Sequence, residues 1–258
     1  MTSTAPSPLP RVRTQLICSD FDESLADADS DRWVHEVLAP DLRRNFDQPN
    51  GPQFTDLCAE LLRQLHARGI TQQQIEAALR SMYFHPAMAR GVKATAESAT
   101  TQTTWFLLSN ANTVYIDTIL KDQNIHQYFL EIVTNPAHFE ASGLLNLRRR
   151  VDPSGPQHTC AVGCSANMCK GDELDAFLAR HGGRGNFERV VYIGDGGNDY
   201  CPVMRMQQGD VALVRTKRGL QRRIEKEGAP QAGIRYWSEA WEVEFILAEL
   251  RGEELLSS

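Results

Sequence analysis

Residues 16–22 read LICSDFD, a short apolar run that ends in two aspartates separated by one phenylalanine. Three further apolar runs lie later in the chain, at residues 105–108, 190–193 and 211–214. Each run is too short for a helix and lacks polar alternation, and segments with helical periodicity separate them, so we interpret them as buried strands of a parallel sheet. The sequence therefore predicts an α/β fold.

Polar clusters follow the first three of these runs. They read SDFD at residues 19–22, SNAN at residues 109–112 and GDGGND at residues 194–199. In open parallel sheets, ligands bind beyond the carboxyl ends of the strands. We therefore expect the three clusters to meet in one crevice, which would hold the functional site.

The segment between the first two clusters has a helical pattern and no convincing strand. Residues 54–68 carry an apolar stripe of period 3.6, and Thr71 and Gln74 have the spacing of a capping box that opens a second helix. We predict a small helical cap over the crevice at residues 33–92, a catalytic core at residues 13–32 and 93–258, and a flexible tail at residues 1–12. Residues 134–169 are rich in Pro, Gly, His, Arg and Cys, which favours a loop or hairpin.

Composition excludes several classes of protein. The chain has 258 residues with 41% hydrophobic and 23% charged side chains, as in an ordinary globular protein. No apolar run approaches the roughly 20 residues that span a bilayer, which excludes membrane transport. The net charge of −6 disfavours binding to nucleic acid or to an anionic membrane. The N-terminus lacks the apolar stretch of a secretory signal and the cysteines are sparse, so we expect a reduced, cytoplasmic protein.

The acidic clusters are suited to a divalent cation. Asp20 and Asp22 share one strand end, and Asp195 and Asp199 arrive from another strand. Several carboxylates in one crevice repel one another unless a cation lies among them, and carboxylate and carbonyl oxygens suit Mg²⁺. The sequence therefore predicts a Mg²⁺ site that could also receive phosphate.

Ser109 and Lys170 would supply a hydroxyl donor and an ammonium charge to a phosphoryl group. Phosphoryl transfer depends mainly on positioning and charge neutralisation. A neutralised Asp20 could attack phosphorus and form an aspartyl-phosphate, while Asp22 protonates the leaving oxygen and then activates water. This interpretation makes the substrate a small phosphorylated metabolite.

The order of these motifs resembles that of haloacid dehalogenase superfamily phosphatases. The stretches DFDESLADADSD (residues 20–31), SNANTVYIDTIL (109–120), CSANMCKGDEL (164–174) and YIGDGGNDYCP (192–202) resemble the phosphoethanolamine/phosphocholine phosphatase branch, which also contains pyridoxal phosphate phosphatases and plant pyrophosphate-cleaving relatives. The resemblance covers about residues 15–215 and implies a Rossmann-like parallel sheet with an inserted cap. The roles that it implies are Asp20 as nucleophile, Asp22 as general acid/base, Ser109, Asn110 and Lys170 as phosphate ligands, Asp20, Asp22 and Asp195 as Mg²⁺ ligands, and Asp199 as the holder of a metal-bound water.

Two positions depart from the pattern of the branch. Ser24 stands where a threonine is usual, which keeps the hydroxyl. Asn110 stands where the branch usually has an aspartate that recognises a cationic head group, whereas the other such acidic residue matches Asp31 and is retained. Losing one carboxylate removes about 1 to 3 kcal/mol of attraction for an ammonium group if the pair is desolvated. Phosphocholine and phosphoethanolamine are the first expected substrates, followed by pyridoxal phosphate and pyrophosphate.

Two non-enzymatic alternatives remain open at the level of sequence. A phosphoaspartate signalling domain also gathers carboxylates, a hydroxyl residue and a lysine at sheet ends, but it needs about half this length and no acid/base partner such as Asp22. A binding protein that kept the fold without the activity is the second alternative. The intact acidic set favours the enzyme over both.

Cys160, Cys164 and Cys169, with His158 nearby, raise the question of a zinc site. Their spacings of three and four intervening residues are not those of a two-knuckle zinc motif, and no second cysteine pair follows. We therefore interpret them as buried or mildly reactive thiols, with metal binding and a disulfide as alternatives.

Overall fold

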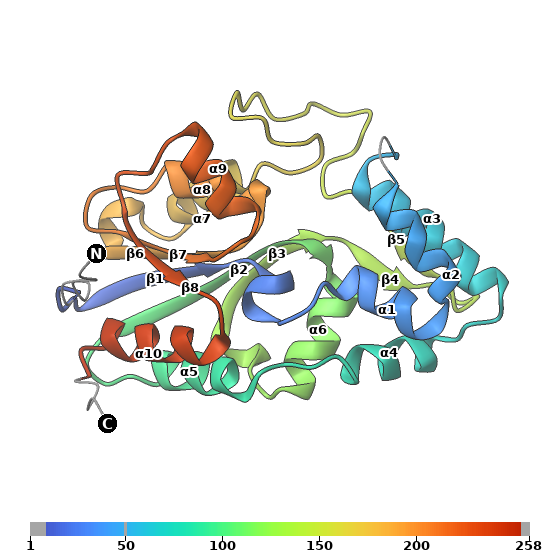
Figure 1. Ribbon diagram of the computed structural model, residues 1–258, viewed down its shortest axis with the longest axis horizontal. Coiled ribbons are helices and arrows are strands. Elements are labelled where there is room, and N and C mark those ends of the chain that lie inside the picture. The colour runs from blue at the N-terminus through green and yellow to red at the C-terminus, as the bar shows by residue number, and fades with distance from the viewer. Residues whose placement is uncertain (1–8, 49–50, 254–258) are drawn as a thin grey trace.

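The computed structural model describes residues 9–48 and 51–253, and within them a six-stranded sheet forms the centre of the molecule (Figure 1). All neighbouring strands are parallel, in the order β3-β2-β1-β6-β7-β8. The strands are β1 (Thr14–Ser19), β2 (Gln102–Asn112), β3 (Phe129–Asn135), β6 (Arg189–Gly194), β7 (Val211–Arg215) and β8 (Gly233–Trp237). The predicted α/β fold with a parallel sheet is confirmed, and the four apolar runs are β1, β2, β6 and β7.

The three strands that carry the polar clusters are neighbours. In the parallel ladders, Ser19 at the end of β1 pairs with Leu107 of β2 and with Ile193 of β6. Because all three strands run the same way, their carboxyl ends lie at the same edge of the sheet. The expected convergence of the clusters follows from this topology.

Helices cover both faces of the sheet (Figure 1). Alternate residues of β1 point to opposite layers, since Leu16 and Cys18 belong to one apolar cluster and Ile17 to the other. On one face lie α7 (Lys170–Arg180), α8 (Tyr200–Met204) and α9 (Gly219–Glu227), and on the other α5 (Pro86–Ala96), α6 (Thr113–Asp122) and α10 (Ala240–Leu250). β1 is therefore buried on both faces, which explains its unbroken apolar run.

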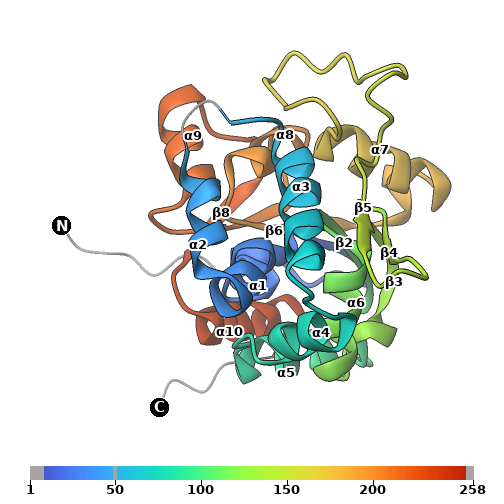
Figure 2. The same cartoon turned by 90° about the vertical axis from the view of Figure 1, so that its right-hand side faces the viewer.

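Further helices lie beyond one end of the sheet (Figure 2). They are α1 (Ser30–Leu38), α2 (Pro40–Arg43), α3 (Phe54–Ala67) and α4 (Gln72–Arg80). The capping box expected from Thr71 and Gln74 is present at the start of α4. Helix α5, the last part of the predicted cap range 33–92, instead packs under the sheet against α10, where a Cβ on Gly91 would come within 2.8 Å of Leu247.

The chain between β3 and α7 forms a hairpin and then a long loop. Strands β4 (Ala137–Phe139) and β5 (Leu145–Leu147) pair antiparallel, and β5 packs against α3. Residues 148–169 follow without helix or strand and run out above α7 in Figure 1. Short helical turns complete the described chain: η1 (Phe21–Leu25), η2 (Arg44–Asp47), η3 (His126–Tyr128), η4 (Arg184–Asn186) and η5 (Gly197–Asp199).

The predicted tail at residues 1–12 lies outside the described residues except for 9–12. Those four residues are held to the body of the protein, for example through the backbone N–H of Leu9, which donates to Glu249 at 2.6 Å, and the carbonyl of Pro10, which accepts from Arg189 at 2.9 Å. Across residues 9–48 and 51–253, no helix combines the length and the apolarity needed to cross a bilayer.

Candidate active site

A cavity of about 270 Å³ opens beyond the carboxyl ends of β1, β2 and β6. All of its charged lining residues are acidic, and the start of α3 contributes Gln53, Phe54 and Thr55 to the lining. The lining residues from the three polar clusters and the adjoining turn are Asp20, Asp22, Glu23, Asp29, Asp31, Ser109, Asn110, Ala111, Asp195 and Asn198. The residues predicted from separate strands therefore meet in one place.

Asp20, which lines this cavity, forms a buried ion pair with Lys170, which lies behind it and does not itself line the cavity. The Lys170 Nζ lies 2.8 Å from Asp20 Oδ2, and the other oxygen of Asp20 accepts a hydrogen bond from the backbone N–H of Phe21 at 2.7 Å. Burial and the charge of Asp199 raise the pKa of Asp20 to about 7, in spite of the lysine. Burial alone would lower the pKa of Lys170, but Asp199 and Asp20 together raise it, so the ammonium stays charged.

The carboxylate of Asp199 is the second partner of the Lys170 ammonium. Its Oδ1 accepts from Lys170 Nζ at 2.7 Å and from the hydroxyl of Tyr192 at 2.8 Å. Its Oδ2 accepts from the backbone N–H groups of Asp195 and Gly196 at 3.1 and 2.9 Å. A Cβ at Gly194 would come within 2.8 Å of the Asp199 carboxyl, so the tight turn after β6 requires a glycine there.

Asp20, Asp195 and Asp199 form an acidic group at the strand ends. Their carboxylate oxygens lie within 4.8 Å of one another. Burial and the charges of Asp199 and Asp20 raise the pKa of Asp195 to about 8, while Ser24 Oγ donates to Asp195 at 3.2 Å. Clustered carboxylate oxygens are the donors that Mg²⁺ prefers, so this donor set fits the expected metal.

The carboxylate of Asp22 lies in a different group. Its Oδ1 accepts from the backbone N–H of Ser30 at the start of α1, at 2.8 Å, and its nearest acidic neighbours are Asp29 and Asp31. Burial raises the pKa of Asp22, as do the charges of Asp29 and Asp31. The structure thus brings the carboxylates of Asp20 and Asp195 together and places that of Asp22 with Asp29 and Asp31 in the lining of the same cavity.

Asp31, expected at the substrate head group, is buried in this second group. Burial and the charge of Asp29 raise its pKa to about 8, and Cys58 is hydrogen-bonded to it. Asp29 caps α1 by accepting from the backbone N–H of Arg32 at 2.9 Å, and it also lines the cavity. Sequence reasoning missed Asp29, although its position just before a helical pattern is that of an N-cap.

Ser109 and Asn110 line the cavity from the end of β2. The hydroxyl oxygen of Ser109 accepts from the backbone N–H of Ala111 at 3.0 Å, which leaves its own hydrogen free to donate. Asn110 Oδ1 accepts from the side-chain amide of Asn198 at 2.9 Å, and this bond links the second cluster to the third. Both residues are placed where a ligand in the cavity could reach them.

A buried amide network behind the cavity was not predicted. Asn135, at the end of β3, donates through Nδ2 to the carbonyls of Asn110 and Ala111 at 2.6 and 2.9 Å. Asn167 donates to Asn135 Oδ1 at 2.8 Å and to Thr55 Oγ1 at 3.3 Å. The network ties the long loop, the start of α3 and the end of β2 together. Its members come from distant segments, so no local spacing signals it.

Comparison with known proteins agrees with this arrangement. A family model described as "Putative Phosphatase" matches residues 15–251. The inorganic pyrophosphatase 2 of Arabidopsis thaliana is 30% identical over 243 residues, which are 94% of this chain and 85% of that protein. A pyridoxal phosphate phosphatase of Bos taurus is 30% identical over 213 residues, 81% of this chain and 85% of that one. A solved HAD-family hydrolase from Salmonella enterica subsp. enterica serovar Typhi has the same fold, with a TM-score of 0.63, 14% identity, and coverage of 97% of this chain and 74% of that one.

Proposed function

This chain belongs to the Putative Phosphatase family, and from that premise we propose that it hydrolyses a small phosphomonoester with Mg²⁺ through an aspartyl-phosphate formed on Asp20. The observation that carries the proposal is the buried contact of 2.8 Å between Lys170 and Asp20, which lines an acidic cavity. A carboxylate nucleophile needs a cation beside it that can also bind the transferred group. Lys170 meets that requirement.

Asp20 and Asp195 would hold Mg²⁺ through their carboxylates, together with Asp22, which the family resemblance places among the ligands and whose backbone carbonyl, at the same strand end as Asp20, would be the donor. The donor set supports this, because the carboxylate oxygens of Asp20, Asp195 and Asp199 are clustered. When bound, the ion would neutralise the charge that otherwise keeps an anionic phosphate out of an acidic cavity. The hydrogen bonds to both oxygens of Asp199 support its role as a fixed outer partner of the site.

Asp20 and Asp22 would act in both chemical steps of the reaction. In the first, a carboxylate oxygen of Asp20 forms a bond to phosphorus, the ester P–O bond breaks, and Asp22 gives its proton to the leaving oxygen. In the second, Asp22 takes a proton from water as that water attacks phosphorus, and the bond to Asp20 breaks to release phosphate. The raised pKa of Asp22 supports the first role, since a proton donor must hold its proton before the reaction. Ser109 and Lys170 would hold the phosphoryl oxygens.

The second acidic group supports a substrate with a cationic head. One carboxylate oxygen from each of Asp22, Asp29 and Asp31 lies within 4.8 Å of the other two, and all three residues line the cavity. An ammonium group among these carboxylates would reduce their repulsion. Phosphocholine and phosphoethanolamine are therefore the first candidates, and pyridoxal phosphate and pyrophosphate, the substrates in the names of two relatives, follow. We assign the choice of leaving group to helices α1–α4, which would act as the cap.

The match to a phosphatase family over residues 15–251 disfavours the signalling domain, and the intact set of Asp20, Asp22 and Asp195 disfavours the silent binding protein. We place the reaction in a reducing compartment such as the cytoplasm, because six cysteines are few for a chain of this length and none forms a disulfide within the described residues.

The test is phosphate release from these four substrates with Mg²⁺ and with a chelator. The native protein should release phosphate from at least one of them, and chelation should stop it. Asp20→Asn should abolish turnover, whereas Asp117→Asn, a change at an exposed aspartate paired with Lys121, should leave it intact. Substantial turnover by a folded Asp20→Asn variant would overturn the assignment of the nucleophile.

A further inference from the structure

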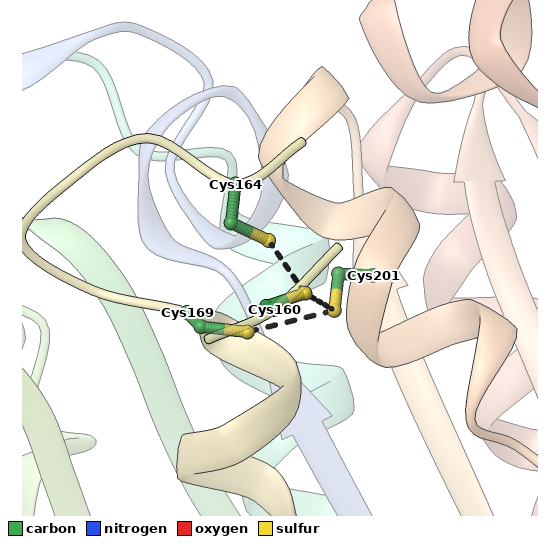
Figure 3. Close-up of side chains that lie close together, drawn as sticks. All are labelled: Cys160, Cys164, Cys169 and Cys201. Atoms are coloured by element: carbon green, nitrogen blue, oxygen red, sulfur yellow. Dashed lines mark hydrogen bonds between the residues drawn. The ribbon is translucent and has the colours of Figure 1, made fainter. Parts of the chain in front are cut away.

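Four cysteine sulfurs meet where the long loop approaches α8 (Figure 3). Cys160 and Cys164 belong to the loop, Cys169 precedes α7, and Cys201 lies in α8. The Sγ of Cys160 lies 3.7 Å from that of Cys164 and 3.5 Å from that of Cys201, and the Sγ of Cys169 lies 3.6 Å from that of Cys201. All four sulfurs lie within 4.8 Å of one another.

The distances between these sulfurs fit a shared metal ion better than a disulfide. A disulfide would bring two sulfurs to about 2.05 Å. A tetrahedral Zn²⁺ with Zn–S bonds of about 2.3 Å holds its four sulfurs about 3.8 Å apart. Three of the six S–S separations, 3.7, 3.5 and 3.6 Å, lie close to that edge length, and the other three are within 4.8 Å. We propose that Cys160, Cys164, Cys169 and Cys201 bind one structural Zn²⁺.

The surroundings of the sulfurs support anionic ligands. Backbone groups of Val162 and Asp172 hydrogen-bond to the sulfurs of Cys160 and Cys169. The guanidinium of Arg205 donates to Cys169 Sγ at 3.6 Å. Four thiolates around Zn²⁺ carry a net charge of −2, which such donors stabilise. A Cβ at residue 171 would come within 2.6 Å of Cys201 Sγ, so the glycine there leaves room for the cluster.

The donor set separates this site from the catalytic one. Four thiolates select a soft metal such as zinc, whereas the carboxylates at the strand ends select Mg²⁺. Four protein ligands also complete the zinc shell and leave no position for substrate or water, as in structural sites. On binding, the four thiols release their protons to the solvent and the resulting thiolates donate electron pairs to Zn²⁺; no oxidation state changes, so no oxidant or reductant is needed.

The position of the cluster indicates what a bound metal ion would stabilise. Residues 148–169 have no helix or strand of their own, yet Ser165 of this loop lines the active-site cavity. Cys169 directly precedes Lys170, and Cys201 follows Asp199 by two residues. A zinc ion at the four sulfurs would therefore fasten the loop to the start of α7, where Lys170 lies, and to α8, which Asp199 directly precedes. The fourth ligand arrives from a separate segment, which is why the sequence pattern of the first three did not indicate zinc.

The test is metal analysis of the native full-length chain, purified under reducing conditions without added metal. We expect one equivalent of zinc per chain that resists dialysis against a weak chelator. Displacing it with a mercurial reagent should release that equivalent as the cluster thiols react, and Co²⁺ should replace it with the intense absorption of a tetrahedral thiolate complex. These readouts require no enzymatic activity and no variant.

Variants locate the metal. Cys160→Ser and Cys164→Ser should each lose most of the zinc, whereas Cys58→Ser, a change at a buried cysteine outside the cluster, should keep one equivalent. Freely reactive cluster thiols in a zinc-free native protein would overturn the proposal. A disulfide between two of the four cysteines, detected by mass spectrometry, or stoichiometric iron in place of zinc would also overturn it.

Discussion

Replacing Lys170 with methionine would remove the one ammonium that contacts both Asp20 and Asp199 while keeping the volume of the side-chain stem. The lysine is 1% exposed, and its Nζ lies 2.8 Å from one carboxylate and 2.7 Å from the other. Removing one partner of a buried ion pair leaves an uncompensated charge and costs about 3 to 5 kcal/mol of stability. Lys121→Met is the matched control, because Lys121 is exposed and pairs with Asp117 at 2.9 Å, a contact worth about 0 to 1 kcal/mol.

Urea unfolding in the presence of a Mg²⁺ chelator gives the free energy of unfolding of each variant without a contribution from bound Mg²⁺. The double variant Lys170→Met/Asp199→Asn should recover part of the loss, with a coupling of about 0.5 to 3 kcal/mol, because it removes one of the two stranded carboxylates. With Mg²⁺, Lys170→Met should lower kcat/KM about 10²- to 10³-fold, the usual effect of losing one donor to a developing oxyanion. Stability within about 1 kcal/mol of the native protein and kcat/KM within about tenfold would refute the assignment of Lys170.

The remaining predictions concern specificity and stability. Asn110→Asp should raise kcat/KM for cationic over neutral esters by about tenfold, since about 1.4 kcal/mol of added attraction is a factor of ten, and an unchanged substrate ranking would contradict the head-group account. Burial lowers the pKa of His35, whose Nδ1–H donates to the carbonyl of Asp31 at 2.7 Å. At this group the unfolded chain binds more protons than the folded chain near and below about pH 6.5, so the contribution of His35 to stability falls as the pH falls. The free energy of unfolding of the native protein relative to that of His35→Gln should therefore decrease from about pH 7.5 to about pH 5.5 in urea titrations, and a difference independent of pH would count against it. Arg189, 1% exposed, donates to Gln15, Pro10 and Leu250. Arg189→Met should destabilise the fold by about 2 to 4 kcal/mol in the same assay because it strands these acceptors, and a change below about 0.5 kcal/mol would show that the network contributes little.

The sequence predicted the centre of the sheet but missed its edges. Strands β1, β2, β6 and β7 are buried on both faces, so their apolar runs stand out from the helical segments around them. β3 and β8 are the outermost strands and expose large side chains, with Leu130 61% and Tyr236 47% exposed. Their mixed composition resembles that of the loops and helices beside them, which is why sequence pattern alone did not identify them.

The sequence predicted those residues of the candidate site whose positions follow from the ends of the parallel strands. Asp20, Ser109 and Asp195 meet because their strands are parallel neighbours. The direction of the Asp22 carboxylate depends on the N-terminus of α1, to which it hydrogen-bonds, and no spacing reveals that contact. Asn135 and Asn167 were missed for the same reason, because their partners lie on segments far apart in the chain.

The most direct test of the account is to trap the phosphorylated enzyme during turnover. The ester that the native protein hydrolyses fastest would be supplied with a radioactive phosphoryl group, and the reaction would be quenched in acid, reduced with borohydride and analysed by peptide mass spectrometry. Nucleophilic catalysis by Asp20 predicts an acid-stable label before reduction and conversion of Asp20 alone to homoserine after it. Label on another residue, or turnover with no labelled protein and no change at Asp20, would contradict the proposed mechanism.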